Sequence, residues 1–187
     1  RMAHGEQGPA DVGVEFGIVV NGIARGEFGP AKRIERAVAR DLAGELPAAT
    51  VRAIRQALLD HLVIFFRDQD LPPSRFLAFA RLFGQPVEYP FVKGIDGFPE
   101  IISVAKLEHE RVNFGGIWHS DTTYLDEPPM GSMLLAREIP PFGGDTLFAS
   151  LYAAYDALSE GMKAMLAPLK GVNTSAKADV SKTREDR

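Results

Sequence analysis

An imidazole and a carboxylate stand two positions apart near the middle of the chain, at His119 and Asp121. If the backbone is extended there, both side chains lie on one face, because alternate residues of a strand share a face. Two histidines and one carboxylate, with further positions left open, are the usual ligand set of non-haem Fe(II) oxygenases. The spacing alone is not specific, since chance gives it in roughly one chain in four of this composition. His119 and Asp121 are therefore candidate metal ligands whose surroundings must decide.

The segment around this pair, residues 113–146, is rich in turn-forming residues. Residues 115–116 are glycines, which allow a close approach of backbone before the pair. Residues 128–129 are prolines, which end an extended segment because proline lacks the N–H that a central strand needs. Residues 133–136 are apolar and predict a buried strand, and residues 140–144 predict a turn. The pattern places the pair in a loop that leads into a strand.

Several short motifs lie in and beyond this segment. In chain order they are LVIFFRDQ at residues 62–69, FARLFG at 79–84, WHSD at 118–121, EPPMG at 127–131, PPFGGDT at 140–146 and AAYDAL at 153–158. In sequence, order and spacing, over about residues 12–175, they resemble the TauD/TfdA family of 2-oxoglutarate-dependent dioxygenases.

The resemblance implies a mainly β, α+β fold: a double-stranded β-helix, or cupin-like jelly roll, flanked by helices near residues 47–60, 74–83 and 152–167. Two facing sheets with helices over their edges would solve the problem of exposed strand edges. Residues 1–187 would form a single domain, the N-terminal two-thirds of the family's domain. Residues 1–11 are expected to be a loose lead-in, and residues 173–187, poor in apolar side chains, a mobile lid.

Hydrophobic spacing supports these elements independently. Apolar residues recur every three or four positions in the first helix, at Val51, Ile54 and Leu58. Residues 12–23 and 62–66 predict strands, and residues 101–104 a short one. The second helix carries a stripe that we assign to the core, and the third carries an apolar face. These two sets are Phe76, Phe79, Ala80 and Phe83, and Tyr155, Leu158, Met162, Met165 and Leu166.

The resemblance also implies cofactors and roles. Fe(II) would be held by His119 and Asp121, and 2-oxoglutarate and O2 would be co-substrates. Thr146 matches the family's threonine that helps to hold the distal carboxylate of 2-oxoglutarate, although a plain strand threonine is the alternative. The third iron ligand, a histidine, and the arginine that pairs with 2-oxoglutarate are expected beyond residue 187. The 187-residue chain is then expected to be an inactive part of a longer protein.

The implied reaction is hydroxylation of a small organic substrate with conversion of 2-oxoglutarate to succinate and CO2. Depending on the group at the hydroxylated carbon, sulfite, sulfate, phenol or amine can then be released. Tyr89, Asn113 and Tyr124 are the candidate substrate-binding residues, with Phe91 beside them, and simple packing is the alternative for each. In the family member that acts on taurine, a histidine and a tyrosine match Tyr89 and Val92, so taurine is disfavoured here.

The composition of the chain bears on the class of protein, its partners and its location. Hydrophobic content of 45% and charged content of 25% are typical of a globular protein. A net charge of −4 gives no reason to expect a nucleic-acid partner. The chain has no cysteine, which excludes disulfides and thiolate metal sites and fits a cytoplasmic location. Neither a membrane span nor a signal peptide is expected. A homo-oligomer, dimer or tetramer, is expected from the resemblance.

Two other classes of function remain open, because a fold does not determine a function. A cupin-type protein could bind a sugar or another ligand without catalysis. A hydrolase or isomerase could use Zn at the same ligands. Succinate production that depends on iron, 2-oxoglutarate and O2 separates both from a dioxygenase.

Overall fold

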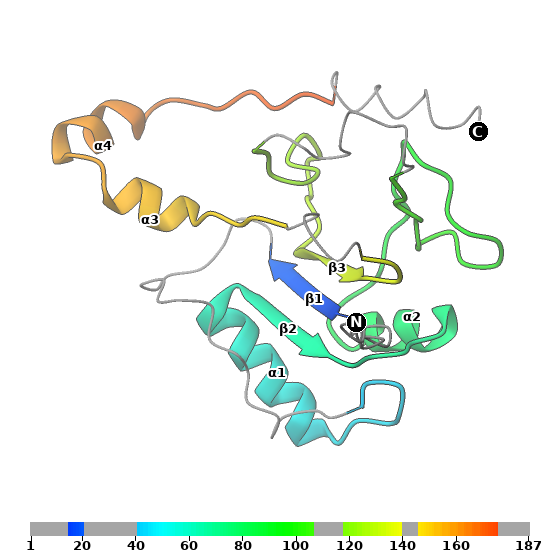
Figure 1. Cartoon of the computed structure of the whole chain (residues 1–187). Helices are drawn as coiled ribbons and strands as arrows, with labels where there is room; N and C mark the ends of the chain where they lie inside the picture. Colours follow the sequence, from blue (N-terminus) through cyan, green and yellow to red (C-terminus); the bar gives the residue numbers. More distant parts are fainter. Residues whose placement is uncertain (1–14, 21–40, 107–117, 140–145, 176–187) are drawn as a thin grey trace, which may run out of the picture.

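The structure is a computed structural model that describes the backbone of residues 15–20 and the residues 41–106, 118–139 and 146–175 (Figure 1). Its elements, in chain order, are β1 (Glu15–Val20), α1 (Ala48–His61), β2 (Val63–Arg67), α2 (Pro73–Arg81), β3 (Gly131–Leu135), α3 (Leu151–Asp156) and α4 (Glu160–Leu166). The predicted lead-in, residues 1–11, lies outside the described residues. So does residue 113, as do the turn at 140–144 and most of the predicted lid.

The strands form one antiparallel sheet in the order β2-β1-β3. β1 lies in the middle, with Ile18 opposite Ile64 of β2 and opposite Met133 of β3. Segments more than a hundred residues apart in sequence are therefore hydrogen-bonded through one strand. The antiparallel pairing agrees with the predicted fold class. The described residues contain this single sheet, so the facing second sheet of a complete β-helix stays a prediction.

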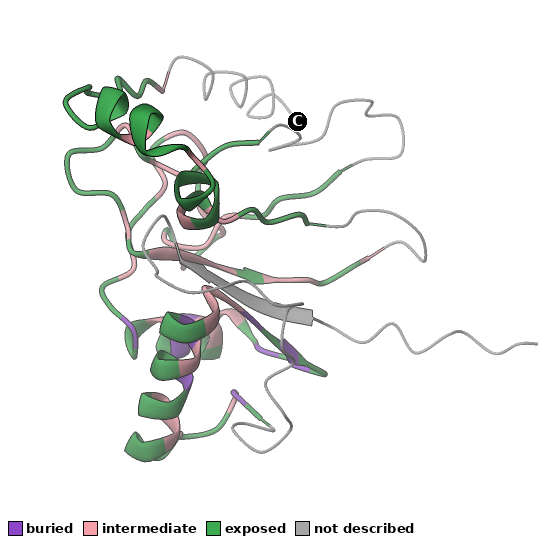
Figure 2. Ribbon diagram, turned by 90° about the vertical axis from the view of Figure 1, so that its left-hand side faces the viewer, coloured by how far each residue is buried: buried purple, intermediate pink, exposed green. Residues whose placement is uncertain are grey.

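The helices α1 and α2 cover one face of the sheet, and the hydrophobic core lies between these helices and the sheet (Figures 1 and 2). Ile64 and Phe66 alternate with exposed residues along β2, as expected for a strand with one buried face. Ile54 of α1 is fully buried, and Phe79 of α2 meets Phe66 edge-on at 6.2 Å between ring centroids. The predicted stripe of α2 is confirmed as core, with Phe79 and Phe83 buried and Phe76 partly buried.

Two polar anchors hold the connection between β2 and α2. The buried side chain of Gln69 accepts a hydrogen bond from the Leu42 N–H at 2.9 Å and donates one to the Arg67 carbonyl at 2.8 Å. Arg137, just after β3, forms an ion pair with Asp70 and donates to the Leu71 carbonyl. The end of β3 is thereby tied to the β2–α2 loop, which fixes where the chain leaves the sheet.

The single helix predicted over residues 152–167 is wrong: two short helices, α3 and α4, occupy this region. Ser150 and Ser159 are the reason, because each side-chain oxygen accepts a hydrogen bond from a first-turn N–H, at Ala153 and at Met162. Serine in an extended conformation is a preferred helix start, so Ser159 begins a new helix. The apolar face expected there is largely exposed, as Figure 2 shows.

The strand predicted at residues 101–104 is also wrong. The structure has no strand over residues 101–106, and the Ile101 carbonyl instead accepts a hydrogen bond from the Ile95 N–H at 2.8 Å. Ile95 and Phe98 form an isolated bridge within the same loop. The apolar residues that predicted a strand therefore close a compact loop.

Candidate active site

His119 and Asp121 lie on the loop that precedes β3, where the chain turns. The residues from 118 to 127 form no strand, so the extended backbone that would place both side chains on one face is not what brings them together. Thr122, directly after the carboxylate, has a φ of 52°, a conformation that β-branched residues rarely adopt. The Leu125 N–H then donates to the Thr122 carbonyl at 3.0 Å and closes the turn. A strained turn, rather than strand alternation, presents the pair.

The two predicted ligands meet side by side. His119 Nε2 lies 3.1 Å from Asp121 Oδ1, and both side chains are about half exposed. Two ligand atoms each about 2.1 Å from one metal ion, at a right angle, would lie about 3.0 Å apart. The spacing and the chemistry of this donor pair therefore fit a metal ion that is reached from solvent. Among the described residues, no group of three or more potential ligands of the His, Cys, Asp or Glu type is assembled.

The second oxygen of the Asp121 carboxylate has its own partner. Ser132 Oγ, on β3, donates a hydrogen bond to Asp121 Oδ2 at 3.0 Å. Sequence reasoning missed this residue. The only available signal was a hydroxyl at the start of an otherwise apolar strand that follows the candidate ligands by about ten positions.

Three predicted pocket residues form an aromatic cluster beside the pair. The ring centroid of Phe91 lies 5.7 Å from that of Tyr89 and 5.8 Å from that of Tyr124. Burial raises the pKa of Tyr124 above its usual value, and the neighbouring Tyr89 and Asp121 raise it further. A tyrosine phenol is neutral at physiological pH in any case, and this shift moves the pKa of Tyr124 further from that range. The cluster connects the metal-ligand pair to the loop that bears Tyr89 and Phe91.

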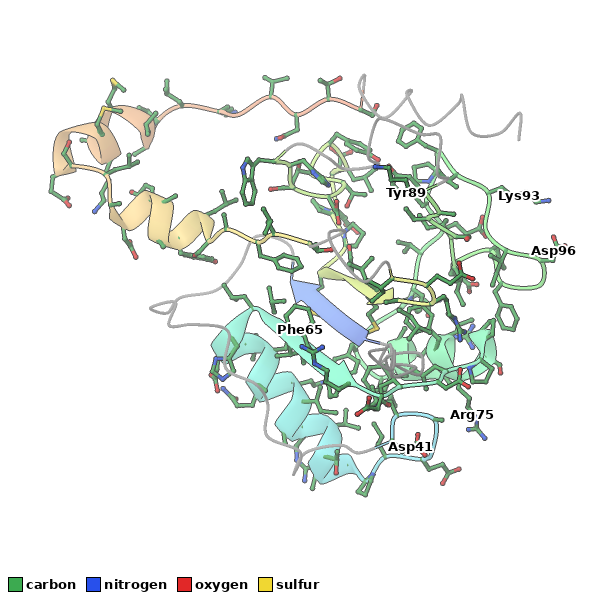
Figure 3. All side chains as sticks on the ribbon, in the orientation of Figure 1. Asp41, Phe65, Arg75, Tyr89, Lys93 and Asp96 are labelled. Atoms are coloured by element: carbon green, nitrogen blue, oxygen red, sulfur yellow. The ribbon has the colours of Figure 1, made fainter. Side chains whose placement is uncertain are left out.

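That loop encloses an open hollow of about 500 Å³. Residues 88–97 and Pro99 line it, including Tyr89 and Phe91 of the aromatic cluster. In Figure 3, Tyr89 lies toward the middle of the molecule, whereas Lys93 and Asp96 project away from it. The hollow thus has aromatic rings on one side and a charged outer rim, which suits a small, partly apolar molecule, although neither His119 nor Asp121 lines it.

Gly94 determines the shape of this loop. A Cβ added at Gly94 would lie 2.3 Å from the Pro99 carbonyl oxygen, so backbone would have to move. We expect Gly94→Ala to lower the free energy of unfolding by about 1–3 kcal/mol, as overpacking usually does. Gly84→Ala is the matched control, because an added Cβ there meets nothing within 4 Å. Urea unfolding of both variants checks this, and equal stabilities would contradict the close approach at Gly94.

The remaining candidates are placed less completely. Thr146 is exposed on the segment before α3. Residue 113 lies outside the described residues. Asn173, where the predicted lid begins, accepts a hydrogen bond from Thr123 Oγ1 through its Oδ1 at 3.2 Å. The segment after α4 therefore contacts the turn that carries Asp121, a link between distant residues that sequence reasoning did not foresee.

Comparison with known proteins identifies the family. The family described as "Taurine catabolism dioxygenase TauD, TfdA family" matches residues 27–187. The chain belongs to the TauD/TfdA family. This confirms the resemblance found in the sequence, and with it the family's character as alpha-ketoglutarate-dependent (2-oxoglutarate-dependent) dioxygenases.

Individual relatives within the family differ in what their names say they act on. An alpha-ketoglutarate-dependent sulfate ester dioxygenase of Pseudomonas putida is 35% identical, over 78% of this chain and 50% of its own length. An alkylsulfatase of Acinetobacter baylyi is 38% identical, over 72% of this chain and 42% of its own. An alpha-ketoglutarate-dependent 2,4-dichlorophenoxyacetate dioxygenase of Cupriavidus pinatubonensis is 33% identical, over 70% and 51%. The chain spans about half the length of these relatives.

None of the helices in the described parts of the chain is both long and apolar enough to cross a membrane.

Proposed function

We propose that the protein is an Fe(II)- and 2-oxoglutarate-dependent dioxygenase that hydroxylates a small organic substrate. The observation that carries this proposal is the approach of His119 Nε2 to Asp121 Oδ1 at 3.1 Å, on a half-exposed turn, in a chain of the TauD/TfdA family. Fe(II), bound with 2-oxoglutarate and O2, supplies the oxidising power that inserts oxygen into a C–H bond.

The residues of the chain hold the metal ion and surround the substrate site. His119 and Asp121 would supply two of three protein ligands to Fe(II), and the resemblance to the family implies a histidine as the third. Their exposure of about half leaves room for a co-substrate on the open side of the metal. The rings of Tyr89, Phe91 and Tyr124 form a wall on one side of the site and exclude water there. Asn173, where the predicted lid begins, is held to the turn that carries Asp121 by the hydrogen bond from Thr123.

Sulfate esters are the first substrate class to test. Two relatives, 35% and 38% identical, carry sulfate ester or alkylsulfatase activity in their names. Hydroxylation of the carbon next to the ester oxygen gives an unstable hydroxy ester, whose C–O bond breaks to yield an aldehyde and sulfate. Sulfonates, aryloxyacids and amines would release sulfite, a phenol or an amine by the same route.

The experiment is a substrate screen with the full-length protein, read by succinate release. Each candidate is incubated with Fe(II), 2-oxoglutarate and O2, and each of these three is omitted in turn. We expect substrate-dependent succinate that requires all three, together with equimolar sulfate or other leaving group. Binding of a compound without any succinate would instead support a non-catalytic ligand-binding protein, and turnover without O2 would support a hydrolase or isomerase.

Thr146→Ala is expected to raise the apparent KM for 2-oxoglutarate. Losing one charge-assisted hydrogen bond of about 1.5 kcal/mol corresponds to a roughly tenfold weaker interaction. Thr146→Ser keeps the hydroxyl and should stay close to the wild type. Steady-state kinetics with varied 2-oxoglutarate measures both variants, and an unchanged KM in Thr146→Ala would remove Thr146 from the site.

A further inference from the structure

The two oxygens of the Asp121 carboxylate have different partners. Oδ1 faces His119 Nε2 at 3.1 Å, and Oδ2 accepts the hydrogen bond from Ser132 Oγ at 3.0 Å. The carboxylate is thus held at both oxygens, one by a candidate fellow ligand and one by a hydroxyl. An ordinary surface carboxylate would rotate freely between such positions.

The two residues of this hydrogen bond, Ser132 and Asp121, lie in backbone of different kinds. Ser132 lies within β3, paired opposite Val19 of the central strand β1, so the sheet sets its position. Met133 and Leu135 pack on the core under α1 and α2, and strand alternation therefore turns Ser132 toward the opposite face. Asp121 instead lies on the turn whose next residue, Thr122, has a φ of 52°. A conformation of this kind persists only when its surroundings support it.

We propose that Ser132 is a positioning residue for the iron-binding carboxylate. Its hydroxyl donates to Oδ2 and leaves Oδ1 for the metal, so that Asp121 binds through one oxygen. A carboxylate that chelated with both oxygens would occupy a position that a three-ligand site must keep open for 2-oxoglutarate and O2. This inference rests on the proposed function. In it, β3 fixes the position of the Asp121 carboxylate relative to the metal ion.

A purely structural role makes a different prediction. If the hydroxyl only satisfies a half-buried polar group, its removal lowers stability and leaves metal binding unchanged. Hydrogen-bond partners of ligating carboxylates, by contrast, typically change metal affinity by about 10- to 100-fold when they are removed. Metal affinity, and not stability, is therefore the quantity that separates the two roles.

The test compares Ser132→Ala and Ser132→Thr with the wild type in the full-length protein. Fe(II) affinity is measured by anaerobic titration, and the visible spectrum of Co(II) in the site reports the coordination of the metal. We expect Ser132→Ala to weaken Fe(II) binding by about 10- to 100-fold and to change the Co(II) spectrum. Ser132→Thr, which keeps a hydroxyl, should keep both the Fe(II) affinity and the Co(II) spectrum close to those of the wild type.

Ser159→Ala is the matched control, because it also removes a serine hydrogen bond, at the start of α4, without touching the pair. It should lower stability while Fe(II) affinity stays that of the wild type. Wild-type Fe(II) affinity and an unchanged Co(II) spectrum in Ser132→Ala would overturn the inference and leave the proposed function standing. A wild-type protein that binds no Fe(II) would overturn both.

Discussion

His119→Ala and Asp121→Ala should each abolish turnover in the full-length protein while leaving the fold nearly intact. Each variant removes one of the two candidate ligands that approach to 3.1 Å, and iron affinity falls with it. Because both side chains are about half exposed, little packing is lost, and the stability of the two variants should stay close to that of the wild type. Succinate release and bound iron after dialysis are the measurements.

Two matched controls remove the same types of side chain at other positions. Asp126→Asn changes an exposed carboxylate on the same loop, and His61→Ala changes the last residue of α1. Both should keep wild-type succinate release. Turnover near the wild-type rate in either His119→Ala or Asp121→Ala would refute the ligand assignment.

Ile54→Ala produces the largest expected loss of stability. Ile54 is fully buried, and it packs where α1 meets β2 and α2. Truncating such a side chain leaves a cavity and costs about 2–5 kcal/mol, a large part of the stability of a typical domain. Urea unfolding measures the loss.

Leu59→Ala, on the exposed side of the same helix, is the comparison. Leu59 is 56% exposed, so its truncation should change the free energy of unfolding by less than about 0.5 kcal/mol. Equal losses in the two variants would mean that α1 does not bury the face described here.

The sequence correctly predicted helices that bury one apolar face. The predictions were wrong where a local hydrogen bond determines the backbone conformation. Val51, Ile54 and Leu58 predicted α1, and Ile54 and Leu58 are indeed buried. The break between α3 and α4 depends on Ser159, which caps the start of a new helix. The spacing of apolar residues gives no information about such a side-chain hydrogen bond. The apolar residues near Ile101 predicted a strand, but a strand also requires a neighbour to pair with.

The candidate site shows the same division. The types and spacing of His119 and Asp121 singled them out, and the structure brings their side chains together. Tyr89, Phe91 and Tyr124, expected near a pocket, meet as a cluster. Ser132 could not be found from spacing, because its approach to Asp121 depends on a left-handed turn at Thr122 and on pairing between β1 and β3. Interactions of this kind are properties of the folded chain and not of its pattern.

The most direct test of the central claim is an anaerobic crystal structure of the full-length protein with 2-oxoglutarate and Mn(II), which stands in for Fe(II) without turnover. We expect one metal ion bound by His119 Nε2 and by a single oxygen of Asp121, with Ser132 Oγ hydrogen-bonded to the other oxygen and 2-oxoglutarate on the open side. A metal ion bound elsewhere, with neither His119 nor Asp121 among its ligands, would contradict this expectation.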